Sequence, residues 1–448
     1  MALEDPSPRQ KAPQRLPTRR PKAPPRQWQA LTLLLPVAIL AASCAPSEPP
    51  RPAPPIVLIT FEGLPAASVG QELTPSLQGF FEEADWAGQG IASSGRADTA
   101  AASLVTGLNP WRHRLQGAND VLAPQLYTLA EALSDLGYTT SGYFAGSLAG
   151  PHGFQQGFGY FRTLLRGRGA QSHLRSLGGE SELVWIHLQH PSPPWIRRDW
   201  LFPAGGPPSR LPRRVDPEDL APYRSPAIEP PEAQRRVFEA LYRNNVSLAD
   251  VLLGRLLQHL RESGHWNDAL VAVTSTQGQE LGGTRADPIA GGLSRGLLEV
   301  PLALKLPRDW ETPLAVAEGE RVATARLFAT LVEAAGGRSA PGVAPSLFQP
   351  TTDRGVLSEG YLSEARLSEG YRVSWLEGDH QLLWTLHGSG ASGDRILLRW
   401  SGDAGGGTEP VAASGAGAEV QDRLTEELRR EWTMFVPVER SPARRLGS

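Results

Sequence analysis

Short runs of consecutive apolar residues recur along the chain from residue 56 onwards. Ile56–Phe61 reads IVLITF and Leu183–Leu188 reads LVWIHL, and Ala269–Ser275 and Val300–Leu306 are of the same kind. Apolar residues fill successive positions instead of alternating with polar ones, which is typical of strands buried on both faces. Such strands belong to parallel sheets that helices cover on both sides, so we expect a sheet of this type.

Segments with helical periodicity separate these runs. Thr128–Leu136 (TLAEALSDL) stops at Gly137, and glycine is the residue that most favours a helix C-terminus. Tyr138–Phe144 then has the pattern of a strand, while Arg236–Glu262 and Arg326–Ala335 have those of amphipathic helices. Strands that alternate with helices predict an α/β doubly wound core.

Two regions depart from this pattern. Residues 202–232 contain nine prolines, which predicts a long surface excursion. From about residue 351, short strands between glycine-rich turns predict a small antiparallel sheet closed by a helix, and within it the motif LSEGY occurs at 357–361 and again at 367–371. The strands are expected at Arg372–Leu376, His380–Leu386 and Arg395–Trp400, and the helix at Gln421–Phe435.

The N-terminal segment has the features of an export signal. Residues 1–29 contain seven Lys or Arg and two acidic residues, and a 13-residue apolar run follows from Ala30 to Ala42. This run is shorter than the roughly 20 residues that cross a bilayer, so a signal peptide is predicted. Residues 40–44 (LAASC) resemble a bacterial lipobox, in which the cysteine is lipidated and becomes the first residue of the mature chain. The alternative is an ordinary signal peptide with an incidental cysteine.

Cys44 is the only cysteine, which excludes an internal disulfide and a cysteine-based metal centre. We expect an extracytoplasmic protein that lipidated Cys44 attaches to a bacterial membrane, facing the periplasm or the cell surface. The net charge of −3 does not indicate the excess of basic residues that is typical of proteins that bind nucleic acid. The expected parts are a signal peptide (1–44), a proline-rich tether (45–55), an α/β core (56–350), a C-terminal subdomain (351–435) and a flexible tail (436–448).

Several stretches resemble the sulfatase family of the alkaline phosphatase superfamily. Residues 56–70 (IVLITFEGLPAASVG) are similar to the family opening VLLITIDTLRADHLG, residues 103–113 (SLVTGLNPWRH) to SLLTGLYPHRH, and residues 267–280 (NDALVAVTSTQGQE) to DDTLVVVTSDHGEE. Eight such stretches follow one another in family order between about residues 55 and 435. The resemblance implies a mixed α/β sheet sandwiched by helices, a small C-terminal antiparallel sheet plus helix, and hydrolysis of sulfate or phosphate esters.

In that family a metal held by carboxylates and amides polarises the ester, and a formylglycine or a Ser/Thr attacks it. The first metal acid falls on Glu62, which keeps a carboxylate, and the neighbouring position, where some members have a second Asp, falls on Gly63. The later Asp-His pair falls on Thr276 and Gln277, which offer oxygen ligands without charge. The nucleophile position falls on Ala97.

The substrate-side positions of the family are also changed. Its DPH histidine falls on Ser192 and the aspartate before it on His190, while His113 matches a family histidine outside the metal cluster. If the alignment with the family motif were shifted by two residues, Thr99 would fall on the nucleophile position. The unbroken match that follows Thr99 argues against such a shift. His187 and His190 are three apart, so we expect opposite faces, with one histidine in the core and one in a loop.

The sequence therefore predicts a sulfatase-like lipoprotein without hydrolase activity, which uses the family cleft or its rim to bind an anionic glycan or an envelope protein. No metal or other cofactor is expected. One alternative is an active hydrolase with calcium or zinc on relocated ligands, for which Glu280 and Asp287 beside Glu62 are candidates. The other alternative is a structural envelope protein in which the cleft is filled.

Overall fold

A computed structural model describes most of the folded part. It covers residues 53–433 except 71, 118, 164–167, 180, 203–206, 208–209, 221–229, 281–291, 318, 352–353, 362–369, 387–393 and 403–406. Cys44, the predicted signal peptide, most of the tether, the predicted tail and Asp287 lie outside the described residues. The chain divides into two compact units, Met1–Arg51 and Pro52–Ser448, and every described residue lies in the second. Among those residues, no helix combines the length and apolar character that a membrane crossing needs.

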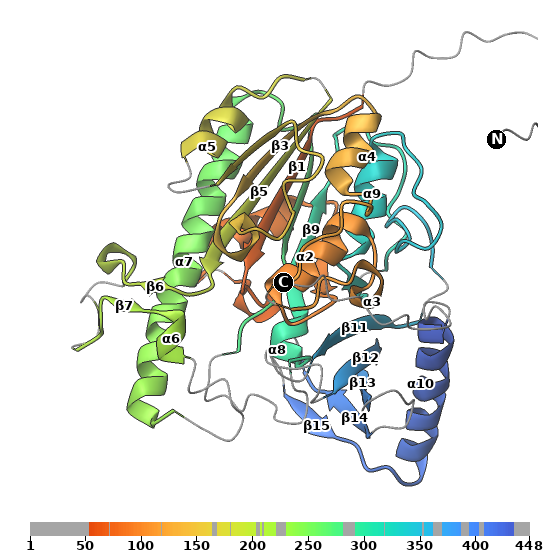
Figure 1. Ribbon diagram of the computed structural model, residues 1–448. Helices are drawn as coiled ribbons and strands as arrows, with labels where there is room; N and C mark the ends of the chain where they lie inside the picture. The colour runs from red at the N-terminus through yellow and green to blue at the C-terminus, as the bar shows by residue number, and fades with distance from the viewer. Residues whose placement is uncertain are drawn as a thin grey trace, which may run out of the picture. The chain divides into compact units, whose positions relative to one another are not determined.

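The main sheet has eight strands (Figure 1). They are β1 (Ile56–Glu62), β2 (Trp86–Ile91), β3 (Thr139–Phe144), β4 (Tyr160–Thr163), β5 (Glu182–Pro191), β8 (Leu270–Ser275), β9 (Glu299–Lys305) and β10 (Val322–Ala323), in the spatial order β10-β2-β9-β8-β1-β5-β3-β4. β1 pairs in parallel with β5 and β8, as the buried apolar runs predict. β9 is also a buried run, but it lies antiparallel to both β8 and β2, so the sheet is mixed.

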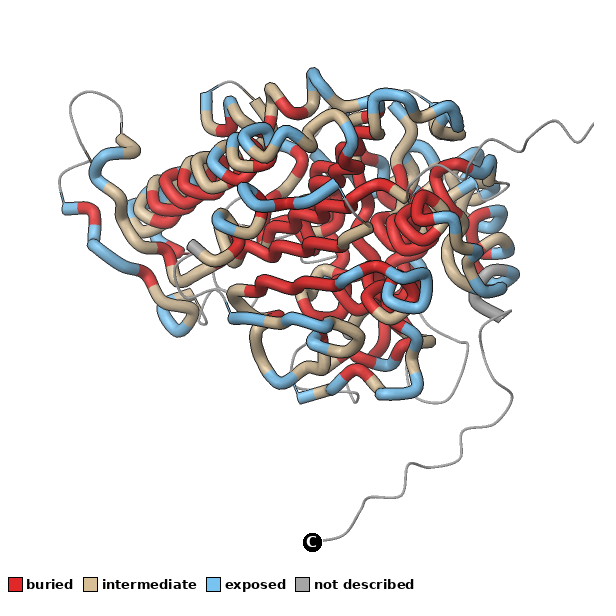
Figure 2. Tube along the Cα trace, turned by 90° about the horizontal axis from the view of Figure 1, so that it is seen from above, coloured by how far each residue is buried: buried red, intermediate tan, exposed pale blue. Residues whose placement is uncertain are grey.

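Helices cover both faces of this sheet (Figures 1 and 2). One face carries α1 (Pro75–Glu83), α5 (Arg168–Arg175) and α7 (Glu232–Glu262), and the other carries α2 (Ala97–Thr106), α4 (Leu129–Asp135) and α9 (Arg326–Ala334). Successive residues of a strand point to opposite faces. Val57 and Ile59 therefore join the core under α7, while Ile56 and Leu58 join the core under α9. Figure 2 shows the buried residues concentrated between these layers.

Shorter elements complete this part of the chain. They are α3 (Pro110–His113), α6 (Pro217–Leu220), α8 (Arg295–Leu298), the 3-10 turns η1 (Ala66–Ser68), η2 (Gly146–Ala149) and η3 (Asp199–Leu201), and the two-stranded ladder of β6 (Trp195–Ile196) and β7 (Arg214–Val215). β7 and α6 lie within the proline-rich excursion 202–232, so part of that excursion folds back on β6.

A second, antiparallel sheet follows, as predicted. Its strands are β11 (Val356–Tyr361), β12 (Tyr371–Glu377), β13 (His380–Leu386), β14 (Arg395–Trp400) and β15 (Thr408–Pro410), paired in that order, and α10 (Ala416–Thr433) follows them. Leu424 and Leu428 of α10 pack on one face of this sheet. Leu383 and Leu398 on the other face pack against Ile91 at the end of β2. The predicted fold class, a mixed helix-covered sheet with a small antiparallel C-terminal sheet, is confirmed.

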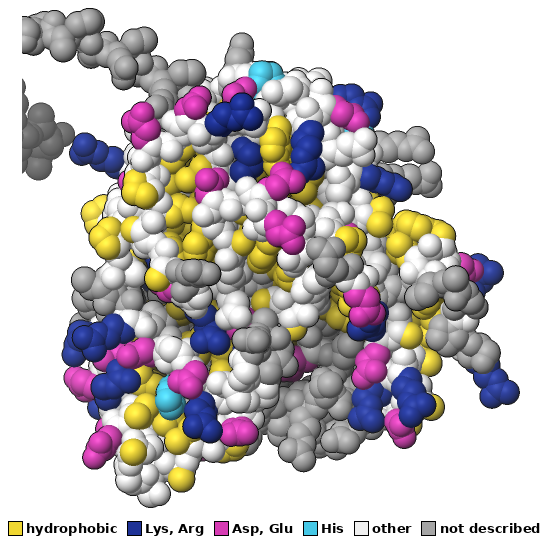
Figure 3. Space-filling model, turned by 180° about the vertical axis from the view of Figure 1, so that it is seen from behind, with side chains coloured by type: hydrophobic (Ala, Val, Ile, Leu, Met, Phe, Trp, Pro, Cys, Tyr) yellow, Lys and Arg dark blue, Asp and Glu magenta, His cyan; other side chains and the backbone are white. Residues whose placement is uncertain are grey.

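The surface of this unit carries charges of both signs. On the face shown in Figure 3, Lys and Arg side chains are interspersed with Asp and Glu, and hydrophobic side chains lie between them. This face therefore has no continuous field of positive charge.

The strand β2 is the main element that the pattern of apolar residues missed. Its sequence, WAGQGI, contains two glycines, which weaken a strand prediction. The glycines are required by packing, because a Cβ on Gly90 would lie 3.1 Å from side-chain atoms of Leu302, Thr324 and Val300. Helix ends differ by a few residues from expectation; α4, for example, begins after Thr128, whose side chain forms a capping box with Glu131.

Candidate functional site

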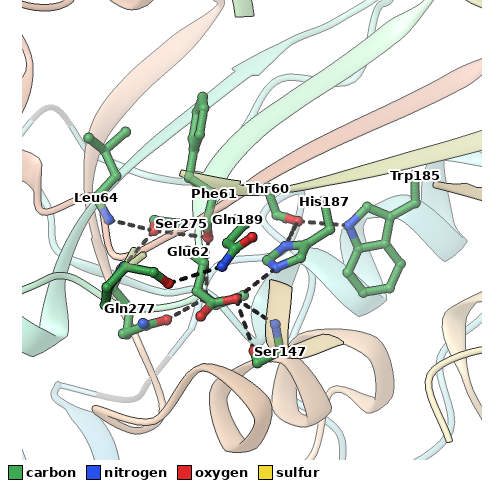
Figure 4. A network of polar contacts seen from close by, with 12 residues as sticks. Thr60, Phe61, Glu62, Leu64, Ser147, Trp185, His187, Gln189, Ser275 and Gln277 are labelled. Carbon is green, nitrogen blue, oxygen red and sulfur yellow. Dashed lines mark hydrogen bonds and ion pairs between the residues drawn. The ribbon is translucent and has the colours of Figure 1, made fainter. Parts of the chain in front are cut away.

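The carboxyl ends of three parallel strands bring the family positions together (Figure 4). Glu62 ends β1, Ser192 directly follows β5, and Thr276 and Gln277 follow β8. The register aligns these ends, because Glu62 lies opposite Pro191 and the residue before it lies opposite the last residue of β8. The resemblance assigned these positions to one family site, and the structure places them at one edge of the main sheet.

Glu62 is held on one of its two carboxylate oxygens. Its Oε2 accepts hydrogen bonds from the Ser147 backbone N at 3.1 Å and the Ser147 Oγ at 2.9 Å, and it lies 3.5 Å from His187 Nε2. Gly146, at φ +69°, allows this approach, since a Cβ there would lie 2.6 Å from Oε2. The sequence reasoning missed Ser147, which lies 85 residues away and in no recognisable motif.

His187 connects Glu62 to the core. Its side chain is fully buried, and its Nδ1 lies 2.9 Å from Thr60 Oγ1, which accepts a hydrogen bond from Trp185 Nε1 at 2.9 Å. A carboxylate only accepts, so the ring assignment consistent with this chain has the proton on Nε2 and lets Nδ1 accept from Thr60. The carboxylate of Glu62 is therefore supported by a continuous set of protein hydrogen bonds.

Gly63 stands where some members of the family have a second Asp, and the backbone excludes a side chain there. Its φ is +87°, and a Cβ would lie 2.5 Å from Ser192 Oγ. The surrounding backbone is tied down, because Ser192 N donates to Glu62 O at 2.8 Å, Gly63 N donates to Gln277 O at 3.2 Å and Tyr242 OH donates to Gly63 O at 3.0 Å. A carboxylate at position 63 would need a different loop.

Thr276 and Gln277 use their oxygens within the protein. The Thr276 hydroxyl lies 3.2 Å from Phe61 O and 2.5 Å from Gln277 Oε1, so its one proton is donated to a protein oxygen. The Ser275 hydroxyl accepts from Leu64 N at 3.2 Å and donates to Gln277 O at 2.7 Å. Thr276 and Gln277 are both buried and neutral, so they add no negative charge to offset that of a divalent cation.

The nucleophile position carries no reactive group. Ala97 is the first residue of α2, and its side chain packs against the core. Thr99, the alternative, is buried, and its hydroxyl lies 3.4 Å from Asp98 Oδ1, which also accepts a 2.8 Å bond from Thr99 N. The Asp98 carboxylate forms a 2.8 Å ion pair with Arg96. The contacts of Thr99 are those of a helix N-terminal turn.

Two family-aligned histidines are neutral. Burial lowers the pKa of His113 to about 3; its Nδ1 accepts from Leu115 N at 3.1 Å and its Nε2 lies 3.0 Å from Ser103 Oγ. Burial, followed by the charge of Arg198, lowers the pKa of His190 to about 4, against the opposing charge of Glu62. His190 lies within β5, so the expectation of a loop histidine is wrong. The strand continues four residues past His187, to Pro191, which pairs with Glu62 at the end of β1.

These residues do not fit a divalent cation. Glu62 is the one carboxylate among the five family positions considered for metal and nucleophile, and the rest are neutral. Among the described residues, no three or more His, Cys, Asp or Glu side chains are grouped as a metal site would require. Of the relocated acids considered, Glu280 is described and half-buried, and Asp287 is outside the described residues.

Comparison with known proteins identifies the fold. No family model matches the chain, and no curated protein matches it in sequence. Solved structures do match: a 2-O GAG sulfatase at 15% identity and a TM-score of 0.61, covering 87% of this chain and 95% of that one. The phosphonate monoester hydrolase of Agrobacterium radiobacter matches at 16% identity and a TM-score of 0.62, covering 87% and 100%.

A second phosphonate monoester hydrolase, from Silicibacter pomeroyi, matches at 16% identity and a TM-score of 0.63, covering 86% of this chain and 96% of that one. At these identities the likeness establishes the fold, and nearly the whole length of each neighbour is covered. The resemblance read from the sequence is therefore confirmed at the level of structure. This chain has the fold of the sulfatases and phosphonate monoester hydrolases of the alkaline phosphatase superfamily.

Proposed function

We propose that this protein is a sulfatase-like lipoprotein that does not hydrolyse esters and instead binds an anionic glycan or an envelope protein at the family cleft or its rim. Lipidated Cys44 would anchor it outside the cytoplasm, and no metal would be bound. The fold supports the general class. The substitutions along β1, α2 and β8 support the loss of activity.

One observation carries the proposal: the position where some family members have a second Asp is closed by the backbone itself. Gly63 has a φ of +87° and leaves only 2.5 Å between a Cβ and Ser192 Oγ. A single missing ligand could be replaced by a neighbour, but here the loop that would present it is shaped for a glycine. Together with Ala97 at the nucleophile position, this leaves neither the charge nor the attacking group that ester hydrolysis by this fold requires.

One cation lies near these positions. The charge of Arg198 helps to lower the pKa of His190, which directly precedes Pro191 and Ser192, whereas Glu62 is an acid. An anionic glycan would therefore be held by the rim and kept off the base of the cleft. One of the fold neighbours was solved with its substrate, D-Glucosamine-2-N, 6-O-disulfate, and a sulfated sugar of that kind is a suitable first probe.

The experiment is a joint measurement of metal content and turnover on the purified full-length protein. We expect substoichiometric calcium, zinc and magnesium by mass spectrometry, and no release of nitrophenol from nitrophenyl sulfate or phosphate. Glu62→Ala tests the one retained ligand position, and Glu82→Ala on the exposed side of α1 is the matched control. Stoichiometric metal with turnover that Glu62→Ala abolishes and Glu82→Ala spares would refute the proposal.

A second candidate, an active hydrolase with relocated groups, is favoured by one contact. The Ser147 hydroxyl donates to the Glu62 carboxylate at 2.9 Å, and a hydroxyl beside a carboxylate is a pair that can act as nucleophile and base. If this candidate holds, Ser147→Ala abolishes nitrophenyl ester turnover while leaving the thermal unfolding midpoint nearly unchanged. The same assay therefore separates the two candidates.

A further inference from the structure

The chain enters the folded unit at the amino edge of the main sheet, where the parallel strands β1, β3, β5 and β8 begin. Pro54 O accepts a hydrogen bond from Tyr138 OH at 2.9 Å. Pro55 O accepts one from Leu270 N, also at 2.9 Å. Tyr138 directly precedes β3, Leu270 begins β8, and both prolines are buried. The chain is therefore fixed to the amino edge before β1 begins.

The family positions lie at the opposite, carboxyl edge of the same sheet. β1 runs from Ile56 to Glu62, and six steps of about 3.3 Å give a span of about 20 Å. β5 and β8 run parallel to β1, so Ser192 and Gln277, which follow these two strands, lie at the same edge as Glu62. The length of β1 therefore separates the entry point of the chain from the family positions.

The second sheet extends the molecule further in that direction. β2 has the same direction as β1, because it lies antiparallel to β9, which lies antiparallel to β8. The last residue of β2, Ile91, packs against Leu383 and Leu398 of the second sheet. Just after β2, Ser93 O accepts a hydrogen bond from Glu359 N of β11 at 2.8 Å. The second sheet thus lies beyond the carboxyl edge, and Figure 1 shows it and α4 at opposite ends of the main sheet.

The chain between Cys44 and the folded unit is short. Residues 45–52 lie outside the described residues, and their number alone sets an upper limit on the distance, because eight residues span at most about 30 Å. To place the carboxyl edge on the membrane that holds Cys44, this segment would have to cover the roughly 20 Å of β1. It would then have to pass the second sheet and α10, which packs on the far face of that sheet, and each layer is about 10 Å thick. The segment is shorter than that path.

The amino edge supplies little attraction to a membrane of its own. Its loops carry exposed charges of both signs, among them Asp135, Asp268, Arg308 and Arg338. Clusters of basic residues are what attract a protein to an anionic bilayer, and this mixture is not such a cluster. The length of the tether is therefore the feature that limits how the folded unit can turn.

We propose that lipidated Cys44 holds the amino edge of the main sheet towards the anchoring membrane and keeps the family positions facing away from it. The inference rests on the proposed function, since it takes the lipid anchor from there and defines the partner of the same site more closely. A lipid headgroup of the anchoring leaflet cannot reach Glu62 in this arrangement. The partner at the family positions is therefore a molecule that approaches from the aqueous side.

The test measures the height of a fluorophore above the bilayer, by energy transfer to acceptor-labelled lipid in vesicles that carry the full-length lipidated protein. Cys44 is the only cysteine and its thiol carries the lipid, so one introduced cysteine takes the label. Ser134→Cys puts the label at the exposed end of α4 on the amino edge, and Ala67→Cys puts it on the exposed turn η1 that follows β1. We expect the label at 67 to lie about 20 Å further from the bilayer than the label at 134.

A longer tether is the matched control. About thirty Gly and Ser residues inserted between Pro50 and Arg51 would let the folded unit turn over, so the difference in height should fall close to zero. A difference that persists in this variant would overturn the role of tether length.

The remaining outcomes separate this inference from the proposed function. Equal heights of the two labels with the natural tether, or a lower height at 67, would overturn the inference while attachment through Cys44 still stood. A protein that stays soluble with Cys44 intact would overturn the lipid anchor and the inference together. The metal and turnover measurements would still decide the loss of ester hydrolysis, because they do not depend on the anchor.

Discussion

Replacement of Glu359 by glutamine should remove a large part of the pH dependence of stability. This side chain, on β11, is fully buried; its Oε2 accepts a hydrogen bond from Tyr371 OH, and its Oε1 has no partner among the described residues. Tyr371 OH in turn accepts from Gln116 Nε2 at 2.9 Å. The backbone beside it fastens the second sheet to the main body, because Glu359 N donates to Ser93 O at 2.8 Å.

The magnitude follows from the pKa of this carboxyl group. Burial raises the pKa of Glu359 from 4.5 to about 7, against the smaller, lowering effects of the Tyr371 hydroxyl and the Trp111 backbone N–H. Below pH 4.5 the carboxyl is protonated in both the folded and unfolded states. The raised pKa therefore causes no loss in the free energy of unfolding there. Between pH 4.5 and 7 only the unfolded state ionises, and stability falls as the pH rises. Above pH 7 the loss levels off at about 3 kcal/mol.

Urea unfolding at pH 5 and pH 8, followed by tryptophan fluorescence, measures this loss. We expect the wild-type free energy of unfolding to fall by about 2–3 kcal/mol more between these pH values than that of Glu359→Gln, whose amide does not titrate. Glu409→Gln, at an exposed carboxylate of β15, is the matched control and should behave like wild type. Equal pH dependence in the wild type and Glu359→Gln would refute the linkage.

Three further predictions concern other parts of the chain. Gly63→Ala should lower the free energy of unfolding in urea more than Gly137→Ala does. Both residues have positive φ, where an alanine costs about 1–2 kcal/mol, but only position 63 adds the close contact with Ser192. Equal losses in the two variants would contradict the inference that the backbone at Gly63 excludes a side chain. Thr128→Ala should cost about 1 kcal/mol through loss of the α4 capping box, measured in the same way. Cys44→Ser should move the protein from the membrane fraction to the soluble fraction on cell fractionation, and persistent membrane attachment would contradict lipid anchoring.

The fold was largely predictable because its strands carry their own signal. Ile56–Phe61 and Leu270–Ser275 each begin with four consecutive apolar residues, a pattern typical of a strand covered on both faces. β2 lacks that signal because neighbouring side chains leave no room for a Cβ at Gly88 and Gly90. Such packing depends on the tertiary structure and cannot be seen in the local sequence. The antiparallel direction of β9 was equally hidden, since a buried run has the same composition in either direction.

The site was predictable in its positions but not in its contacts. Alignment of IVLITFEG with the family opening was enough to locate Glu62, and the predicted strand Ala269–Ser275 placed Gln277 just after a strand end. Nothing in the sequence indicates that Ser147 would donate to Glu62, because the pair is joined only by the packing of β1 beside β5 and β3. The repeated LSEGY motif also has a structural consequence, since Tyr371 of the second copy bonds Glu359 of the first.

The contacts around Glu62 also bear on whether one restored family ligand would be enough to create a metal centre. An aspartate at 63 would need a loop without the positive φ and without Ser192 Oγ at its present place. Charged groups at 276 and 277 would have to replace a hydroxyl and an amide that bond each other and Phe61 O. Meanwhile the Glu62 carboxylate already accepts two hydrogen bonds from Ser147, so part of its hydrogen-bonding capacity is satisfied without a cation. On the proposed loss of the metal site, the contacts at 62, 63, 276 and 277 therefore each oppose the return of a single ligand.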